Sequence, residues 1–245
     1  MMRRLLLNTR NGPNHIERNV RFFSAPICNS FFEDLMVKGT SDPRFSKLPT
    51  DIQEKLLEVQ NKSQFIPNIF LGLTHRPNEF RAFFNYYDAL MNETTSELTL
   101  YEKEMIVCAT SAHNKCLYCV VAHGALLRVY FKKFLTQKPG TDQQVPYNII
   151  ADQVSNDFHK SYLIDKKQTK MLDYALLLCK EPHLVKTQHL VELKEEYKFS
   201  RDAIWDIGAI TSFFAASNRL AHMSGLMPNE EFYEIGRKPL PPKKQ

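Results

Sequence analysis

The sequence predicts an all-α protein, and three observations support this fold class. Apolar residues recur at intervals of three and four along most of the chain, and the sustained two-residue alternation of strands is missing. Helix start and stop residues bracket these stretches, such as Ser200 before a long apolar run and Gly225 after it. Hydrophobic residues make up 43% and charged residues 24% of the 245, which is ordinary for a globular protein with a substantial core.

The first part of the chain predicts three helices. Residues 48–63 form an amphipathic pattern with Ile52 and Leu56 on the apolar side. Pro67 interrupts this pattern, and residues 69–74 predict one short turn or helix. Pro77 fits the first turn of a third helix that runs to about Met91.

The middle of the chain predicts two helices separated by a short turn. Thr99 is a suitable N-cap and Glu102 completes a capping box, so a helix is expected from Leu100. This helix is expected to end around residues 113–115, where polar side chains favour a turn, and a second helix is expected to open at Cys116.

The remaining sequence predicts further helices after a polar stretch, Lys132 to Val145, in which Pro139-Gly140 marks a loop. The expected helices are Pro146 to about Asn156, Gln168 to Lys180, a helix capped by Thr187 that runs to Tyr197, and a long helix capped by Ser200 that runs to Ser224. Gly225 is well placed to end the last of these.

The N-terminal residues 1–23 differ in composition from the rest of the chain. They hold five arginines and one glutamate, a balance of +4 within the total net charge of +5. An arginine-rich, acid-poor leader predicts a mitochondrial transit peptide and a place in the matrix, whereas a plain disordered basic tail would leave the protein cytoplasmic. We therefore divide the chain into this leader, an N-terminal extension at 24–46, a helical domain at 47–235 and a disordered tail at 236–245.

Several function classes lack support in the sequence. No glycine-rich phosphate loop is present, and no basic surface with interleaved aromatic residues is evident, so nucleotide and nucleic-acid binding are not expected. No apolar stretch predicts a membrane span. The five cysteines are an odd number with one close pair, which is unlike a secreted disulfide framework and favours a reducing compartment. Of these, Cys108 and Cys179 are expected to be core residues, and Cys28 is assigned no role.

One short stretch combines residues suited to redox chemistry at sulfur. Cys116 and Cys119 form a CxxC pair, His123 follows four residues later, and Glu104 precedes the pair by twelve residues. In a helix that opens at Cys116, the two cysteines and His123 fall on one stripe, at about 100° per residue. The helix N-terminus and the CxxC spacing both favour thiolate, which is the nucleophilic form of cysteine. A helical hairpin would bring Glu104 to the same place.

This pattern, with the capped helix before it, resembles the AhpD-like alkylhydroperoxidase family, which is grouped with the carboxymuconolactone decarboxylases. The similarity is greatest to the branch of peroxidase-related proteins. It extends from about Lys47 to Tyr233 and includes Phe65–Phe70, Phe80–Met91, Leu172–Leu176 and Phe213–Ala221. The resemblance implies an AhpD-like helical bundle with a CxxC helical hairpin.

The resemblance also implies roles for the matching residues. Cys119 would attack a hydroperoxide, Cys116 would resolve the product into a disulfide, and His123 and Glu104 would relay the proton. An external dithiol, such as a lipoyl group, would reduce the disulfide, without metal or flavin, in a homo-oligomer that is a trimer or hexamer. One position departs from the family: Tyr118 stands where a second histidine often precedes the second cysteine.

The sequence leaves alternatives open. His113, Cys116, Cys119 and His123 have spacings that could supply four zinc ligands, and buried inert thiols are another possibility. The family also contains non-redox decarboxylase-like enzymes and sestrin-like stress or interaction proteins. Aromatic residues are expected mainly in the core, but four of them are candidates for a pocket over the thiols: Tyr86, Tyr87, Tyr118 and Phe213.

Overall fold

The structure is a computed structural model that describes residues 31–137 and 145–237. The predicted leader, the start of the N-terminal extension, Cys28, the Pro139-Gly140 loop and nearly all of the expected C-terminal tail lie outside the described residues.

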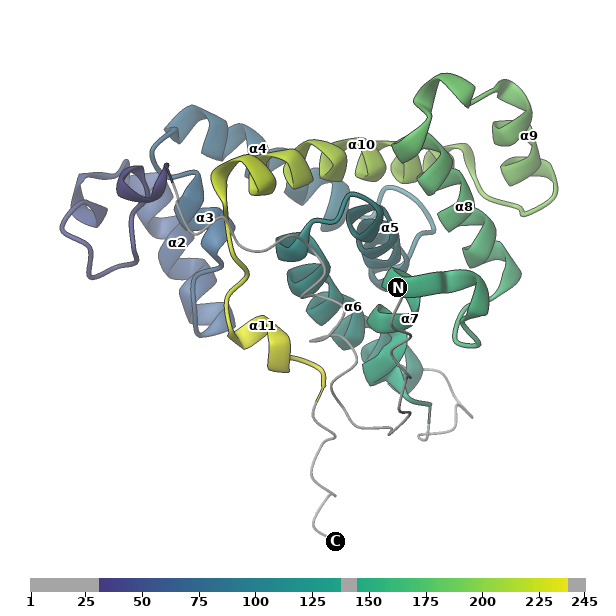
Figure 1. The fold of residues 1–245 in the computed structure, drawn as a ribbon, viewed down its shortest axis with the longest axis horizontal. Coiled ribbons are helices and arrows are strands. Elements are labelled where there is room, and N and C mark those ends of the chain that lie inside the picture. Colours follow the sequence, from purple (N-terminus) through teal and green to yellow (C-terminus); the bar gives the residue numbers. More distant parts are fainter. Residues whose placement is uncertain (1–30, 138–144, 238–245) are drawn as a thin grey trace, which may run out of the picture.

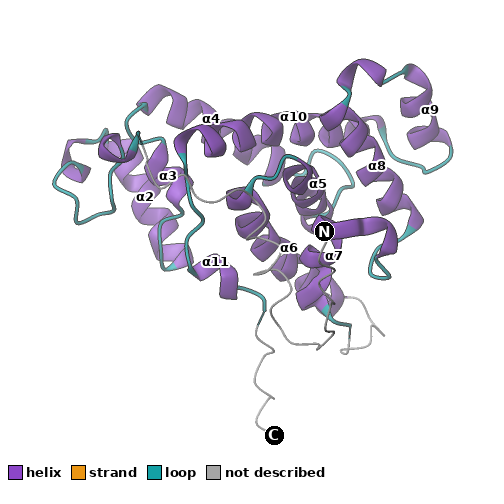
Figure 2. Cartoon of the chain, viewed as in Figure 1, coloured by secondary structure: helices purple, strands orange, loops and turns teal. Residues whose placement is uncertain are grey.

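The described residues form an all-α fold that contains no strand, as predicted (Figures 1 and 2). Short 3₁₀ turns connect several of its helices. The α-helices are α2 (Thr50–Ser63), α3 (Asn68–Gly72), α4 (Pro77–Met91), α5 (Leu100–His113), α6 (Leu117–Gln137), α7 (Ile150–Asp157), α8 (Lys166–Lys180), α9 (Thr187–Glu195), α10 (Arg201–Ser224) and α11 (Glu231–Glu234).

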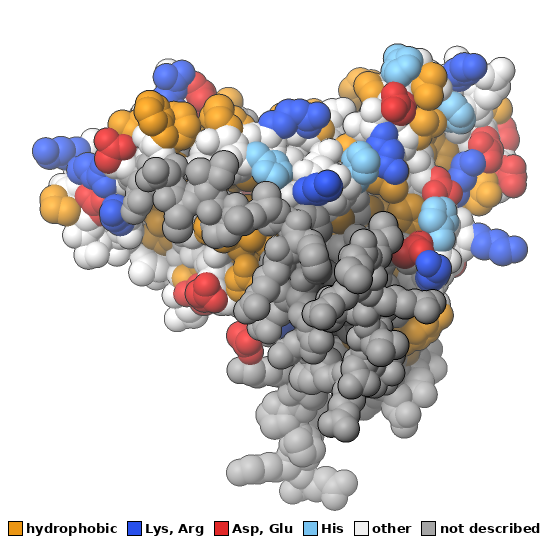
Figure 3. Space-filling view, in the orientation of Figure 1, with side chains coloured by type: hydrophobic (Ala, Val, Ile, Leu, Met, Phe, Trp, Pro, Cys, Tyr) orange, Lys and Arg blue, Asp and Glu red, His pale blue; other side chains and the backbone are white. Residues whose placement is uncertain are grey.

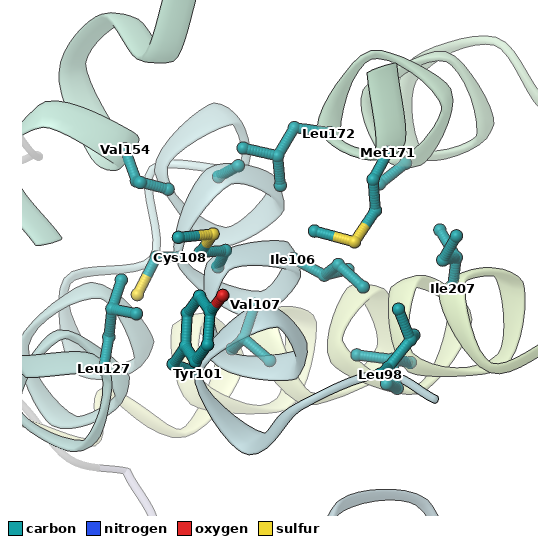
Figure 4. Packing of buried hydrophobic residues seen from close by; sticks show 14 of the residues in the cluster. Leu98, Tyr101, Ile106, Val107, Cys108, Leu127, Val154, Met171, Leu172 and Ile207 are labelled. Atoms are coloured by element: carbon teal, nitrogen blue, oxygen red, sulfur yellow. The ribbon is translucent and has the colours of Figure 1, made fainter. Parts of the chain in front are cut away.

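Helix α5 is the centre of the fold. Nearly all its residues from Tyr101 to Ser111 are buried, and it packs against α6, α7, α8 and α10. A helix that is apolar on every side is stable only when neighbours surround it. Figure 4 shows its residues Ile106, Val107 and Cys108 among Leu127, Val154, Met171 and Leu172, which come from α6, α7 and α8. The long helix α10 runs across one side of this centre (Figure 1).

Three predicted helix ends are confirmed. The Thr99 hydroxyl accepts from the Glu102 amide, and the Glu102 carboxylate accepts from the Thr99 amide, which is the predicted capping box. The Ser200 hydroxyl accepts from the Ala203 amide at 3.0 Å. Gly225 ends α10 in the left-handed region with φ 65°. Local side-chain chemistry at these positions therefore coincides with the tertiary fold.

Other predicted boundaries are wrong by a few residues. Helix α6 continues to Gln137 into the stretch expected to be polar loop, because Phe131 and Phe134 still pack on the core there. Helix α8 starts at Lys166 rather than Gln168, since Asp165 is the cap and Gln168 is the third helical residue of its capping box. Helix α7 starts only at Ile150, after a 3₁₀ turn. Thr187 is the first residue of α9 rather than its cap.

Lys103 ties the end of α4 to α5. Its side chain is buried, and its ammonium group donates to the carbonyls of Leu90 at 2.7 Å and Glu93 at 2.9 Å. These carbonyls lie at the C-terminal end of α4, where backbone acceptors lack partners within the helix. Burial lowers the pKa of Lys103. This contact holds the end of α4 close to Glu104, the residue that follows Lys103.

Arg128 holds the C-terminal segment against α6. The side chain is 1% exposed, and its guanidinium donates to the carbonyls of Phe232 at 3.3 Å and Ile235 at 2.8 Å. Burial lowers the pKa of Arg128 to about 10. Gly236 has φ 74°, and a Cβ atom there would meet the Arg128 Cβ at 2.7 Å, so glycine is required by conformation and by space.

Candidate active site

A tight turn places the CxxC pair at the N-terminus of α6. Lys115 adopts a left-handed conformation with φ 56°, and the Cys116 amide donates back to the Ser111 carbonyl at 2.9 Å. Cys116 therefore precedes the first helical residue, Leu117, instead of opening the helix as predicted, and its carbonyl accepts from the Val120 amide at 3.0 Å. This position directs the backbone N–H groups of the first turn toward the Cys116 sulfur.

The two thiols are reduced, buried and in contact. Each residue is 1% exposed, and the thiol of Cys119 donates a hydrogen bond to the sulfur of Cys116. This bond, with the amides of Cys119 and Tyr118, lowers the pKa of Cys116. The same bond and burial raise the pKa of Cys119. The pair thus favours a thiolate on Cys116 and a proton on Cys119.

Glu104 and His123 meet across the two helices. The Glu104 Oε2 atom lies 2.8 Å from the His123 Nδ1 atom. Glu104 is 1% and His123 is 9% exposed, so the carboxylate faces the imidazole and is shielded from solvent. A carboxylate only accepts, so Nδ1 carries the hydrogen and Nε2 is left as the basic nitrogen. The ring is also held by Phe214, whose ring lies edge-on at 4.7 Å.

Cys119 and His123 line one cavity of about 110 Å³. The rest of its lining is almost entirely apolar, with Ser217 as a hydroxyl and aromatic rings from α3, α4, α10 and α11. Those rings are Phe70, Phe83, Phe84, Tyr87, Phe214 and Phe232. At about 30 Å³ for each water, this space admits a few waters or one small organic molecule. Neither Cys116 nor Glu104 lines it.

Tyr118 lines the cavity but has a structural partner. Its hydroxyl accepts from the Ile69 amide of α3 at 3.1 Å, and burial raises its pKa well above the ordinary value. The residue that replaces a family histidine therefore orients α3 over the cavity. A phenol with a raised pKa does not exchange protons readily near neutral pH.

The four candidate pocket aromatics divide into two pairs. Tyr87 and Tyr118 line the cavity, whereas Tyr86 and Phe213 do not. Tyr86 is 49% exposed and lines a separate surface cleft between α8, α9 and α10, and its ring packs edge-on against Phe213 at 5.4 Å. Tyr86 and Tyr87 are neighbours on α4, so their side chains point about 100° apart.

Asn218 of α10 contacts both sulfurs and was not among the predicted site residues. Its side chain hydrogen-bonds to Cys116 and Cys119, and the Ser217 hydroxyl also bonds to Cys119. Its amide nitrogen donates to the Ser111 hydroxyl at 3.0 Å, and its oxygen accepts from Asn114 at 2.9 Å. The sequence signal for Asn218 is the family resemblance of the segment Phe213–Ala221, but that resemblance does not indicate contact with sulfur.

The zinc alternative finds no matching geometry. Within residues 31–137 and 145–237, no three His, Cys, Asp or Glu side chains are grouped so that they could hold a metal ion. His113 is exposed at the end of α5, whereas the thiols are buried. Among the helices of the same described ranges, none has the length and apolar character needed to cross a bilayer.

Comparisons with known proteins place the chain in a family. The model of the carboxymuconolactone decarboxylase family matches residues 77–130, which contain Glu104, both cysteines and His123. An uncharacterised peroxidase-related protein from Ralstonia eutropha JMP134, described as an alkylhydroperoxidase AhpD core, is 49% identical, with 80% of this chain and 95% of that chain covered and a TM-score of 0.71. The chain belongs to the AhpD-like, carboxymuconolactone decarboxylase family.

Other solved structures extend this AhpD-like likeness. A peroxidase-related protein from Silicibacter sp. TM1040 is 28% identical, covering 80% of this chain and 92% of that one, with a TM-score of 0.68. The debrominase Bmp8 is 15% identical, covering 76% and 90%, with a TM-score of 0.56, and shares the fold. A search among curated proteins finds no match.

Proposed function

We propose that this AhpD-like protein is a thiol-dependent peroxidase that reduces a small organic hydroperoxide through the Cys116–Cys119 pair. The observation that carries the proposal is the shared cavity of Cys119 and His123, with Glu104 held 2.8 Å from the far nitrogen of the imidazole. Nucleophile, base and orienting acid occur in the order that activation of a thiol requires.

The first step begins with the proton of Cys119. The raised pKa of this thiol keeps it protonated near neutral pH, so a base is needed, and His123 lines the same cavity. Glu104 stabilises the imidazolium that forms. The Cys119 thiolate attacks the terminal, hydroxyl-bearing oxygen of the peroxide. The O–O bond breaks, and the imidazolium protonates the alkoxide that leaves. The products are an alcohol and a sulfenic acid on Cys119.

The second step uses Cys116. Its thiolate is stabilised by the backbone amides at the start of α6 and is already in contact with the Cys119 sulfur. It attacks that sulfur, the S–O bond of the sulfenic acid breaks, and a Cys116–Cys119 disulfide forms. The departing hydroxide takes up a proton and leaves as water. An external dithiol then supplies two electrons and restores both thiols.

The cavity favours the organic class of peroxide. Its walls are aromatic and aliphatic around two reactive side chains, and its volume of about 110 Å³ suits a small apolar substituent. Hydrogen peroxide gains nothing from such walls, because it is small and polar.

Turnover measurements with tert-butyl hydroperoxide, cumene hydroperoxide and hydrogen peroxide, with dithiothreitol as the donor, test this function. We expect the alkyl peroxides to be consumed faster, and mass spectrometry to find a Cys116–Cys119 disulfide after one turnover without donor. Peroxide consumption that persists in a Cys119→Ser variant would overturn the mechanism. Absence of both consumption and disulfide would favour the sestrin-like or decarboxylase-like alternatives.

Mitochondrial import and a homo-oligomeric state remain predictions. The first depends on the arginine-rich residues 1–23 and the second on the family resemblance. Import into isolated mitochondria with cleavage after Phe23, and the mass in solution by light scattering, would test them.

A further inference from the structure

A group of cationic side chains surrounds the turn that carries Cys116. His113 and Lys115 lie at this turn, Lys180 ends α8, and Arg219 and His222 belong to the last turns of α10. All five are exposed, and we call them the cationic face. Burial lowers the pKa of His113, and the positive charges of Lys180 and Lys115 lower it further. In Figure 3, Lys, Arg and His side chains spread across the middle of the surface, over α10 and the α5–α6 turn.

The cationic face has few neutralising acids. No Asp or Glu occurs from Met105 to Thr141 or from Ile207 to Asn229, the two stretches that contribute most of it. Neither lysine nor Arg219 forms an ion pair with any acid in the part of the chain that the structure describes. The acid next in sequence, Glu181, lies 3.7 Å from His183 instead. The positive potential of this face is therefore directed outward.

The cationic face adjoins the turn that carries Cys116. Lys115 is bonded covalently to Cys116, and Arg219 follows Asn218, whose side chain contacts both sulfurs. The Nε2–H group of His222 donates to the carbonyl of Asn114, so α10 is joined to the turn itself. Cys119 lines the cavity and Cys116 does not. Cys119 thus borders the cavity, whereas Cys116 directly follows Lys115 of the cationic face.

Lys115 occupies a backbone conformation that normally belongs to glycine. Its φ of 56° places it in the left-handed region, at the position after a helix end where glycine is the usual residue. A non-glycine residue is strained in this region, because its Cβ atom comes too close to the following carbonyl oxygen. Gln64 and Lys198 adopt the same conformation, so what distinguishes Lys115 is that its charged side chain adjoins Cys116.

We propose that the cationic face is the entry surface for an anionic dithiol donor, which reduces the Cys116–Cys119 disulfide at the turn that this face surrounds. The inference rests on the proposed function, because it concerns the second half of that cycle. A donor with a negative group near its dithiol is drawn to this face, whereas a neutral apolar peroxide enters the cavity. Opposite charge raises association rates by tenfold or more at low ionic strength.

The exchange balances in atoms and electrons. A donor thiolate attacks the Cys116 sulfur, the S–S bond breaks, and Cys119 leaves as thiolate and takes a proton from His123. The second donor thiol, after losing its proton, attacks the donor sulfur of the mixed disulfide and releases Cys116 as thiolate. The donor ends as a disulfide, and its two electrons reside on the protein thiols.

Two forms of one dithiol test the charge directly. Dihydrolipoate carries a carboxylate, and dihydrolipoamide carries a neutral amide on the same dithiol. Protein is first oxidised to the disulfide, with peroxide or with diamide, and the rate of thiol recovery is followed at low salt. We expect dihydrolipoate to react roughly three- to tenfold faster than dihydrolipoamide, and added salt to remove the difference.

Charge variants locate the effect. Lys115→Glu and Arg219→Glu are expected to abolish or invert the preference for dihydrolipoate. Lys115→Gly is expected to weaken it while raising the melting temperature, because glycine relieves the left-handed strain, so misfolding cannot explain that loss. Lys133→Glu is the matched control, since it makes the same charge change roughly 25 Å further along α6, at 1.5 Å per residue, and should leave the preference intact.

The result that overturns the inference is distinct from failure of the proposed function. Equal rates for the two donors, unchanged in Lys115→Glu, would show that the cationic face does not admit the donor, even though the disulfide forms with peroxide. Disulfide formation with diamide but never with peroxide would instead contradict the peroxidase and leave the donor preference as an independent measurement.

Discussion

Two hollows in this molecule differ in size and in chemistry. The cleft between α8, α9 and α10 has a volume of about 750 Å³, and its lining includes Trp205 and Tyr86 but no cysteine or histidine. The cavity beside the CxxC pair has about 110 Å³ and contains a thiol and an imidazole. The smaller cavity is lined by aromatic residues of α3, α4, α10 and α11, whereas the larger cleft is open to solvent. Reactive groups, rather than volume, therefore identify the candidate site.

Cys119→Ser offers the strongest way to break this comparison. Without the thiol that lines the cavity there is no nucleophile, so we expect peroxide turnover to fall by at least about 10³-fold, the scale of loss for a covalent catalyst. Turnover is measured with cumene hydroperoxide and excess dithiothreitol. Cys179→Ser, which changes a thiol outside the cavity, serves as the control and should retain activity.

His123→Gln sharpens the role assigned to the base. We expect kcat/KM to fall by roughly 10²-fold or more near pH 7, which is the range for loss of a general base. The raised pKa of Cys119 means that its thiolate becomes more abundant as the pH rises. The variant should therefore gain activity steadily as the pH rises from about 7 past about 8.5, the ordinary pKa of a thiol, without levelling off there, because the pKa of Cys119 is raised. A loss that stays constant across this range would argue for a purely structural histidine.

Asn218→Ala tests the contact that joins both sulfurs to α10. Removing the amide takes away the hydrogen bonds to Ser111 and Asn114, and the loss of buried hydrogen bonds costs about 1–3 kcal/mol of stability. It also removes a hydrogen bond that lowers the pKa of each thiol. We expect a several-fold slower reaction of the pair with iodoacetamide at neutral pH and a lower melting temperature. Asn218→Asp keeps the size of the side chain but loses its N–H donors. It therefore separates the effect on stability from the effect on the thiol pKa.

Trp205→Ala in the large cleft should have the smallest effect. Trp205 is 76% exposed and contacts neither thiol nor cavity. We expect kcat/KM to stay within about twofold of the wild type, as surface substitutions usually do for stability and function. A tenfold loss in kcat/KM would show that the comparison is wrong and that the large cleft takes part in turnover.

The parts of the fold that depend on neighbouring residues were predictable. The Thr99–Glu102 capping box and the αL Gly225 are local features, so the ends of α5 and α10 followed from the sequence. The meeting of Glu104 with His123 could be expected only as a consequence of a hairpin. The start of α6 after Cys116, rather than at it, depends on a hydrogen bond from Cys116 to Ser111 in the preceding helix.

The rest of the site depends on contacts between distant segments. Tyr118 bonds to Ile69, Asn218 reaches the thiols from α10, and Phe232 closes the cavity from the C-terminal side. No periodicity distinguishes Tyr87, which lines the cavity, from Tyr86, which lines the cleft, because the packing partner of each ring is set by helices far away in the sequence.

The buried Arg128 makes the C-terminal segment around α11 a part of the cavity wall. Its bonds to the carbonyls of Phe232 and Ile235 hold in place the Phe232 ring, which forms one wall of the cavity. A truncation that removes α11 would therefore open this cavity to solvent without changing either thiol.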